Sequence, residues 1–339
     1  MLKKIIFIVA IVAFSEVLGL PMLTAKQDEA KIRVVVTIDI LKAICSPIIE
    51  GEGEVSSILS EEAEPHSFTL TPSDIERALN SDLIVITGHM QWEEDLVRQV
   101  SEERKVPEES VSLNLLNLRD IKVLELDGGR NIHGFWLLPD NALTIARALK
   151  DRLCELKPGS SERLSWNYQA FERKVSNLKG FISKVSRTYG LSGKKVVIGF
   201  YAEQYIAEAL GLRVEAVLLG EQESIRPEIL RRIYEGFQSG DYAAMIVSDS
   251  ALRMENVQRA LEEISEKSGS PIAYVLAVSG SGLESYEAIM YYNAGQVYGA
   301  LLERREAPSS GFNLYFFTTI ACLLIIVVET ILLFRRRAF

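Results

Sequence analysis

The stretch PGSSERLSWNYQAFERKVSNLKGFISKVSRTYG, residues 158–190, decides how the chain is divided. Pro158 and Gly159 precede it, either of two serines can cap it, and Gly190 can close it. Between these ends, apolar side chains recur at spacings of three and four without a break: Leu164, Tyr168, Phe171, Val175, Leu178, Ile182, Val185 and Tyr189. This pattern predicts one continuous helix over 159–190, about 40 Å long.

Two sets of short β-branched runs flank this helix. The first set is Arg33 to Thr37, Leu83 to Thr87 and Ile121 to Leu126; the second is Lys195 to Ile198, Val214 to Leu218, Ala244 to Val247 and Ile272 to Val275. Short apolar runs bounded by polar residues are typical of strands buried on both faces. Helical segments alternate with them, one opening at Thr71-Pro72-Ser73-Asp74 with an N-cap and a first-turn proline. The alternation predicts parallel sheets in an α/β fold.

The fold class expected is therefore two Rossmann-like α/β lobes with parallel sheets, joined by one long rigid helix. The N-terminal lobe covers residues 26–158, the linking helix 159–190 and the C-terminal lobe 191–311. A coiled-coil dimer seam is the alternative for the long helix, because its spacing is heptad-like. Its aromatic side chains favour packing against two lobes. A gap between the lobes is then the place for a ligand, beyond the carboxyl ends of the strands.

The first 25 residues are typical of a secretory signal peptide. Lys3 and Lys4 precede an apolar run from Ile5 to Phe14, and small residues lead to Ala25. The apolar run is short for a membrane span, which needs about 20 residues. An uncleaved N-terminal anchor is the alternative.

Residues 312–334 are almost wholly apolar, and the three arginines 335–337 follow at once. This length predicts a C-terminal transmembrane helix, and the positive charges place residues 335–339 in the cytoplasm as a short tail. The expected localisation is thus a cell membrane, crossed once, with the globular part outside.

The chain carries a formal net charge of −9. Removing +1 for residues 1–25 and +2 for residues 312–339 leaves −12 for the outer part. This acidity argues against nucleic acid as a partner. Cys45 and Cys154 lie too far apart for a CxxC metal clip, and either a disulfide or two buried thiols fits them. No Walker loop, HExxH or GxSxG motif is present, so an enzyme is not expected.

All three histidines of the chain fall in the N-terminal lobe. His66 lies just before the helix cap at Thr71, His89 follows the strand Leu83 to Thr87, and His133 lies between the strand Ile121 to Leu126 and Pro139. Loops at the carboxyl ends of parallel strands converge on one edge. Imidazole is the commonest nitrogen ligand of zinc and its neighbours, so the pattern predicts a metal site with His66 and His133 as its first candidates.

Residues 65–74, PHSFTLTPSD, resemble the signature of the solute-binding proteins of zinc/manganese ABC importers. The resemblance continues through 78–85, through His133 with the WLLPDNA of 136–142, and to the closing YEAIMYYN of 286–293. It covers most of residues 32–303. It implies two lobes joined by a rigid helix, with Zn(II) or Mn(II) held between them and delivered to an ABC permease in the same membrane.

The resemblance also implies two ligands from each lobe. His66 and His133 match the first pair. The third ligand, a histidine or glutamate, would fall near Phe200, where this chain has no histidine. The fourth, an acid, would fall near Leu276 or Ala277, where no acid is present. His89, Glu203 and Asp249 are possible substitutes. If none of them serves, the alternative is a binding or adhesion protein on the same fold that has lost its metal and takes another ligand.

Overall fold

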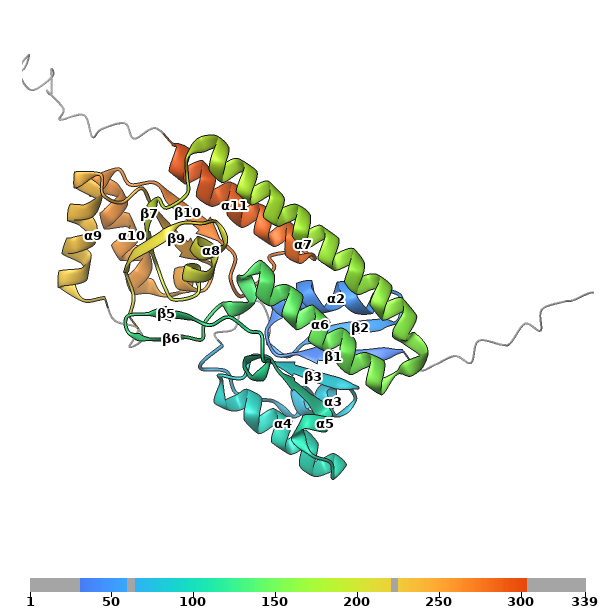
Figure 1. Cartoon of the computed structure of the whole chain (residues 1–339). Coiled ribbons are helices and arrows are strands. Elements are labelled where there is room, and N and C mark those ends of the chain that lie inside the picture. Colours follow the sequence, from blue (N-terminus) through green and yellow to red (C-terminus); the bar gives the residue numbers. More distant parts are fainter. Residues whose placement is uncertain (1–30, 60–64, 221–224, 304–339) are drawn as a thin grey trace, which may run out of the picture.

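The computed structural model describes residues 31–59, 65–220 and 225–303. Two α/β lobes lie along one long helix, α7 (Ser161–Tyr189), which runs beside both of them (Figure 1). The parallel sheets fit the expected α/β fold.

The sheet of the N-terminal lobe has four parallel strands, in the order β2 (Gly53–Ser57), β1 (Ile32–Val36), β3 (Leu83–Ile86) and β4 (Ser112–Asn114). The two central strands consist almost wholly of Val, Ile and Leu, and every residue of β3 is buried. Such runs suit strands that are covered on both faces. The helices of this lobe are α2 (Lys42–Ile49), α3 (Pro72–Leu79), α4 (Gln91–Arg104), α5 (Glu108–Val111) and α6 (Pro139–Leu156).

The sheet of the C-terminal lobe repeats this topology. Its parallel strands lie in the order β10 (Ile272–Val275), β9 (Ala244–Ser248), β7 (Lys195–Ile198) and β8 (Arg213–Val217). Counted along the chain within each lobe, both sheets have the order 2-1-3-4. The helices are α8 (Glu203–Ala209), α9 (Pro227–Ser239), α10 (Glu255–Ser268) and α11 (Tyr286–Leu302).

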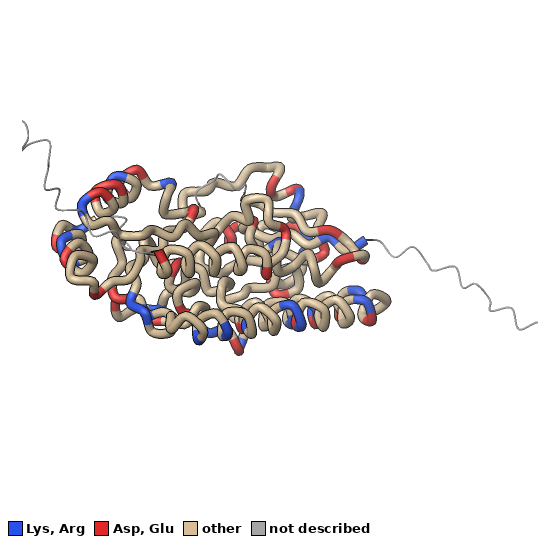
Figure 2. Tube along the Cα trace, turned by 90° about the horizontal axis from the view of Figure 1, so that it is seen from above, with Lys and Arg blue, Asp and Glu red and all other residues tan. Residues whose placement is uncertain are grey.

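The long helix α7 packs against α2 and α6 of the first lobe and against α11 of the second (Figure 1). Its buried stripe includes Leu164, Phe171, Val175, Leu178 and Ile182. Tyr189, at the end of the predicted stripe, is instead 58% exposed. Gly190 ends the helix with a φ of 63°, a left-handed conformation that glycine adopts readily. Figure 2 shows acidic and basic residues intermingled along the backbone trace rather than separated by sign.

One predicted strand takes a different place. Only Leu124–Leu126 of the run from Ile121 to Leu126 is a strand, β5, and it pairs antiparallel with β6 (Gly129–Asn131) outside both parallel sheets. This hairpin reaches the other lobe, where Gln204 donates to the Glu125 carbonyl at 2.9 Å and Lys122 pairs with Glu208 at 2.6 Å. The apolar residues that predicted a strand of the main sheet therefore lie in a segment that contacts the other lobe.

The expected C-terminal transmembrane helix is corrected here. Within residues 31–59, 65–220 and 225–303, no helix is both long and apolar enough to cross a bilayer. Residues 312–334, on which that expectation rested, lie outside the described residues, as does the expected signal peptide of residues 1–25.

Candidate metal site

The three histidines meet at one place. The ring centroids of His66 and His89 are 5.7 Å apart, and each lies 5.2 Å from the ring of His133. One nitrogen from each ring can be chosen so that all three nitrogens lie within 4.8 Å of one another. The segments that carry them are 23 and 44 residues apart in sequence, so the fold brings them together.

His89 follows β3 and is fixed by its neighbours. Its Nδ1 lies 2.8 Å from the hydroxyl of Thr87, and that hydroxyl lies 2.6 Å from Oε2 of Glu93. Glu93 is fully buried at the start of α4 and also accepts the backbone N–H groups of Thr87 and Gly88, at 2.8 and 2.9 Å. One carboxylate thus organises the whole loop between β3 and α4.

His66 is held through the same helix. The indole of Trp92 donates to the carbonyl of Pro65 at 2.8 Å, and its ring packs edge-to-face against Phe68 at 5.0 Å. Because Trp92 and Glu93 are adjacent, the first turn of α4 positions the loops of both His66 and His89.

His133 lies where the N-terminal lobe touches the other lobe. Its backbone N–H donates to Asn131 at 3.0 Å, and the amide of Asn131 donates to the Tyr201 carbonyl at 2.8 Å. Gly134 has a φ of 85°, and a Cβ there would lie 2.9 Å from the Cα and carbonyl oxygen of Ala202. Only glycine allows this turn and this approach together.

Two of the imidazoles are held neutral. Burial, with a smaller contribution from His66, lowers the pKa of His89 to about 4. Burial, and then repulsion from His89 and His66, lowers the pKa of His133 to about 3. A neutral imidazole offers a lone pair to a cation without first losing a proton.

A cavity of about 30 Å³ lies between the three rings and the C-terminal lobe. That lobe contributes Phe200, Ala202, Ser250, Met254 and Val278 to its wall. The ring of Phe200 is 5.7 Å from that of His133. No carboxylate is among the described residues of the wall. The cavity suits one ion with a water-sized ligand, and it is too small for an organic solute.

The structure does not bring Glu203 into this group. Glu203 is fully buried, and its carboxylate accepts the N–H of Phe200 at 3.1 Å and that of Ser248 at 2.7 Å. Burial raises the pKa of Glu203 to about 7 despite these hydrogen bonds. Its side chain thus ties the start of α8 to the end of β9.

Asp249 is likewise outside the group. It accepts backbone N–H groups from the loop after β10, those of Ala277 at 2.8 Å, Val278 at 3.4 Å and Ser279 at 2.9 Å. Both its oxygens are therefore engaged in shaping that loop.

Sequence reasoning missed the residues that position the histidines: Thr87, Trp92, Glu93 and Asn131. One signal was available for Glu93. An acid a few residues beyond a strand end, in the first turn of the next helix, commonly receives the N–H groups of the connecting loop. No comparable pattern marks Trp92 or Asn131, whose partners are far away in sequence.

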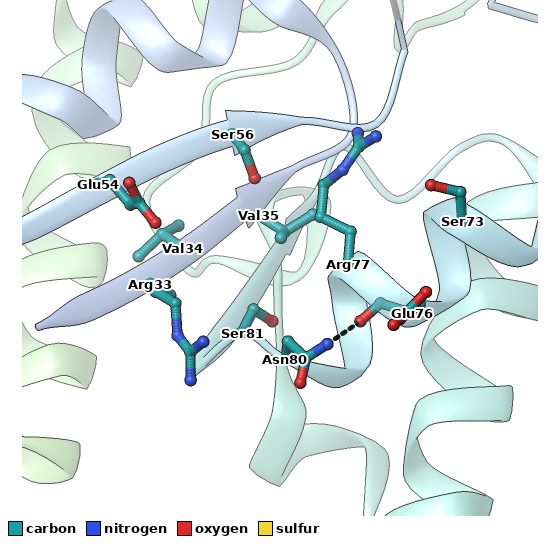
Figure 3. A pocket seen from close by; sticks show the side chains of 10 residues that line it. All are labelled: Arg33, Val34, Val35, Glu54, Ser56, Ser73, Glu76, Arg77, Asn80 and Ser81. Carbon is teal, nitrogen blue, oxygen red and sulfur yellow. Dashed lines mark hydrogen bonds between the residues drawn. The ribbon is translucent and has the colours of Figure 1, made fainter. Parts of the chain in front are cut away.

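A larger hollow, of about 330 Å³, lies on the N-terminal lobe. Figure 3 shows the side chains that line it. Arg33 and Glu54 of β1 and β2 line it together with Glu76 and Arg77 of α3. Asn80 closes one side, where its amide donates to the Glu76 carbonyl at 2.9 Å. Mixed charges and no imidazole make this hollow a poor cation site.

Cys45 and Cys154 are both free, and burial raises the pKa of the Cys45 thiol to about 12.

The family model described as "Zinc-uptake complex component A periplasmic" matches residues 34–300. The chain is 22% identical over 294 residues to a metal ABC transporter substrate-binding lipoprotein of Lactococcus lactis, covering 82% of this chain and 90% of that protein. It is 26% identical over 277 residues to the iron-binding protein YfeA of Yersinia pestis, covering 80% and 86%.

Among solved structures, the fold is similar to that of the solute-binding protein FpvC from Pseudomonas aeruginosa in complex with Mn2+. The TM-score is 0.64 at 19% identity, over 80% of this chain and 98% of that one. At this identity, the likeness shows the shared fold.

These findings correct the expected localisation, a single-pass membrane protein anchored by residues 312–334. The Lactococcus relative and a Streptococcus pyogenes relative are both named as lipoproteins. Among the described residues of this chain, no helix could cross a membrane.

The match over residues 34–300 takes in both lobes and all three histidines. Proteins of this kind are receptors that bind a divalent metal for an ABC importer, and they are not enzymes. The chain belongs to the family of periplasmic zinc-uptake component A proteins, the metal-binding solute-binding proteins of ABC importers.

Proposed function

We propose that the chain captures Zn(II) with His66, His89 and His133 and delivers it to its ABC permease. The observation that supports this is the convergence of three imidazoles, with nitrogens within 4.8 Å, on a cavity of about 30 Å³. In this proposal all protein ligands come from the N-terminal lobe, and a water molecule completes the coordination.

The geometry fits a small cation after a modest adjustment. Zinc–imidazole bonds of about 2.0–2.1 Å in a tetrahedron place the nitrogens about 3.4 Å apart. From separations of up to 4.8 Å, the nitrogens therefore have to approach one another by up to about 1.4 Å, which side-chain rotation can supply. His66 is exposed, whereas His89 and His133 are half-buried, so it is the ring with most room to move.

The ligand set favours zinc over manganese. Nitrogen ligands suit zinc, whereas manganese prefers carboxylate, carbonyl and water oxygens. Glu203 and Asp249 could have supplied carboxylates, but both are engaged with backbone N–H groups. The family description also names zinc.

The test is a titration of the metal-free chain with Zn(II) and with Mn(II) in a calorimeter. We expect one Zn(II) to bind per chain. We expect the affinity for Mn(II) to be at least about 100-fold lower than that for Zn(II). His66→Ala, His89→Ala and His133→Ala should each weaken zinc binding by more than about 100-fold, beyond the usual effect of losing a residue that only supports a ligand.

Asp140→Asn is the control, since Asp140 is an exposed carboxylate of the same lobe and lies outside the cavity wall. It should keep zinc affinity within about threefold, below 1 kcal/mol. Wild-type affinity in His133→Ala would refute the proposed ligand set, and tighter binding of Mn(II) would refute the choice of zinc.

A further inference from the structure

We propose that Thr87 and Glu93 form a relay that fixes His89 in one tautomer and so makes it a ready ligand. The proposal rests on the proposed function, in which His89 binds the cation. Thr87 and Glu93 are positioning residues here, because they act through His89 and do not reach the cation themselves.

The direction of the hydrogen bonds follows from counting hydrogens. The Thr87 hydroxyl has one hydrogen and lies 2.6 Å from Glu93 Oε2 and 2.8 Å from His89 Nδ1. The carboxyl of Glu93 acts as an acceptor, since it also receives the N–H groups of Thr87 and Gly88. The hydroxyl therefore donates to Glu93 and accepts from His89.

It follows that Nδ1 of His89 carries the hydrogen. In a neutral imidazole the other nitrogen, Nε2, then keeps its lone pair. The ring that is held this way faces His66 and His133 at centroid distances of 5.7 and 5.2 Å. A metal-binding histidine is usually oriented by a hydrogen bond from its second ring nitrogen to a carboxylate, a backbone carbonyl or water. Here the Thr87 hydroxyl takes that place and passes the contact on to the Glu93 carboxylate.

Burial makes the relay rigid. Thr87 and Glu93 are both 0% exposed, so water does not compete for their hydrogen bonds. Glu93 is also bound by the hydroxyl of Thr37, which follows β1. The carboxyl of Glu93 is thus held by residues at two strand ends and at the start of one helix. Because Thr87 bonds to both Glu93 and His89, the imidazole of His89 is held in place as well.

The chain offers a close control in Thr37. Thr37 and Thr87 are both fully buried, and each donates its hydroxyl hydrogen to Glu93. Of the two threonines, Thr87 is the one whose hydroxyl also lies within hydrogen-bond distance of His89 Nδ1. Thr37→Val and Thr87→Val therefore make the same chemical change to the same carboxyl, and they differ in whether the imidazole loses its partner.

The experiment measures the ring nitrogens of His89 by 15N NMR in the metal-free, full-length chain, which has only three histidines to assign. Wild type and Thr37→Val should show the hydrogen on Nδ1. Thr87→Val should show a mixture or the opposite tautomer, and its zinc affinity should fall about 10–100-fold. Thr87→Ser keeps the hydroxyl, so its His89 tautomer and its zinc affinity should both match those of wild type.

The relay is overturned if Thr87→Val keeps the hydrogen on Nδ1, or if Thr37→Val loses as much zinc affinity as Thr87→Val. The second result would mean that the loop needs Glu93 for folding alone. Failure of the proposed function would be seen separately, as unchanged zinc affinity in His89→Ala, because the tautomer is measured without metal.

Discussion

The two lobes have sheets of the same strand order, yet they use the polar residues at their strand ends differently. In the N-terminal lobe, Glu93 receives the loop N–H groups after β3, and His89 in the same loop is left to face the gap. In the C-terminal lobe, Glu203 and Asp249 receive the loop N–H groups, and the residues on the cavity wall are the apolar Phe200, Ala202, Met254 and Val278 together with Ser250.

The difference shows what a strand-end loop needs before it can bind a ligand. Buried N–H groups at the end of a strand have to be satisfied first. A carboxylate that does this is held toward the loop, and neither Glu203 nor Asp249 lies among the ligand atoms gathered at the gap. The N-terminal lobe has both an organising acid and an imidazole in one loop, and in our proposal it supplies the ligands. The C-terminal lobe adds a mostly apolar wall.

The largest expected effect is a loss of stability in acid that comes from the N-terminal lobe. His133 and His89 have pKa values of about 3 and about 4 in the folded chain, lowered by burial. Unfolded, both take up a proton below about pH 6.5. The unfolded state therefore binds more protons between pH 6.5 and about 4, and the free energy of unfolding decreases as the pH falls through this range.

For the metal-free chain, each of these histidines should lower the free energy of unfolding by about 2 kcal/mol between pH 7 and pH 5. Glu203 acts in the opposite direction, because its raised pKa of about 7 lets the folded chain take up a proton first, and it should offset about 2 kcal/mol of their sum. Denaturant unfolding at the two pH values measures the net change, and His133→Asn should shift that change by about 2 kcal/mol toward higher stability at pH 5. An unchanged loss in His133→Asn would show that His133 is accessible to protons in the folded chain.

A change at the contact between the lobes should have the next largest effect. Gly134→Ala places a Cβ at a φ of 85° and within 2.9 Å of the Ala202 backbone. Strain and overlap together should lower the free energy of unfolding by about 2–3 kcal/mol. Gly180→Ala is the control, because nothing lies within 4 Å of its Cβ in the middle of α7. It should raise stability by up to about 1 kcal/mol. Equal effects would contradict a tight contact at Gly134.

The difference between the two lobes can be reduced by giving the C-terminal lobe an imidazole at the gap. Phe200 lines the cavity opposite His133, so Phe200→His should supply a fourth nitrogen and strengthen zinc binding by about tenfold or more. Phe181→His adds an imidazole on α7, where Phe181 is 41% exposed, and should leave the affinity unchanged. Weaker zinc binding in Phe200→His would mean that the apolar wall itself supports the site.

The smallest effect expected is at a hydrogen bond that joins the lobes. The hydroxyl of Tyr286, on α11, donates to the carbonyl of Leu137 at 2.8 Å, and the residue is 2% exposed. Tyr286→Phe should lower the free energy of unfolding by about 1–2 kcal/mol, because a buried carbonyl loses its partner. Tyr189→Phe, at a side chain that is 58% exposed, should change it by less than about 0.5 kcal/mol.

Much of the fold could be predicted from local patterns. The stripe from Leu164 to Ile182 and the apolar strand runs depend on periodicity, which the sequence shows directly. Edge strands β2 and β4 were missed, since their residues are mostly half-buried and polar. The run from Ile121 to Leu126 was misplaced, because its partners Gln204 and Glu208 are distant in sequence.

The site could be predicted in part. The loops of the three histidines were found because strand ends converge, but nothing in the sequence distinguishes a carboxylate that faces the gap from one that binds the backbone. Glu203 and Asp249 were candidates on that ground, and the structure places both on loop N–H groups. The role proposed for Thr87 likewise depends on a distance between side chains, which no sequence pattern gives.

A crystal structure of the zinc-loaded chain, with zinc located by its anomalous scattering, tests most directly whether one lobe alone binds the metal. We predict zinc bonded to nitrogens of His66, His89 and His133 at about 2.0–2.1 Å, with water as the remaining ligand. A carboxylate oxygen of Glu203 or Asp249 bonded to zinc, or His89 turned away from it, would contradict this account.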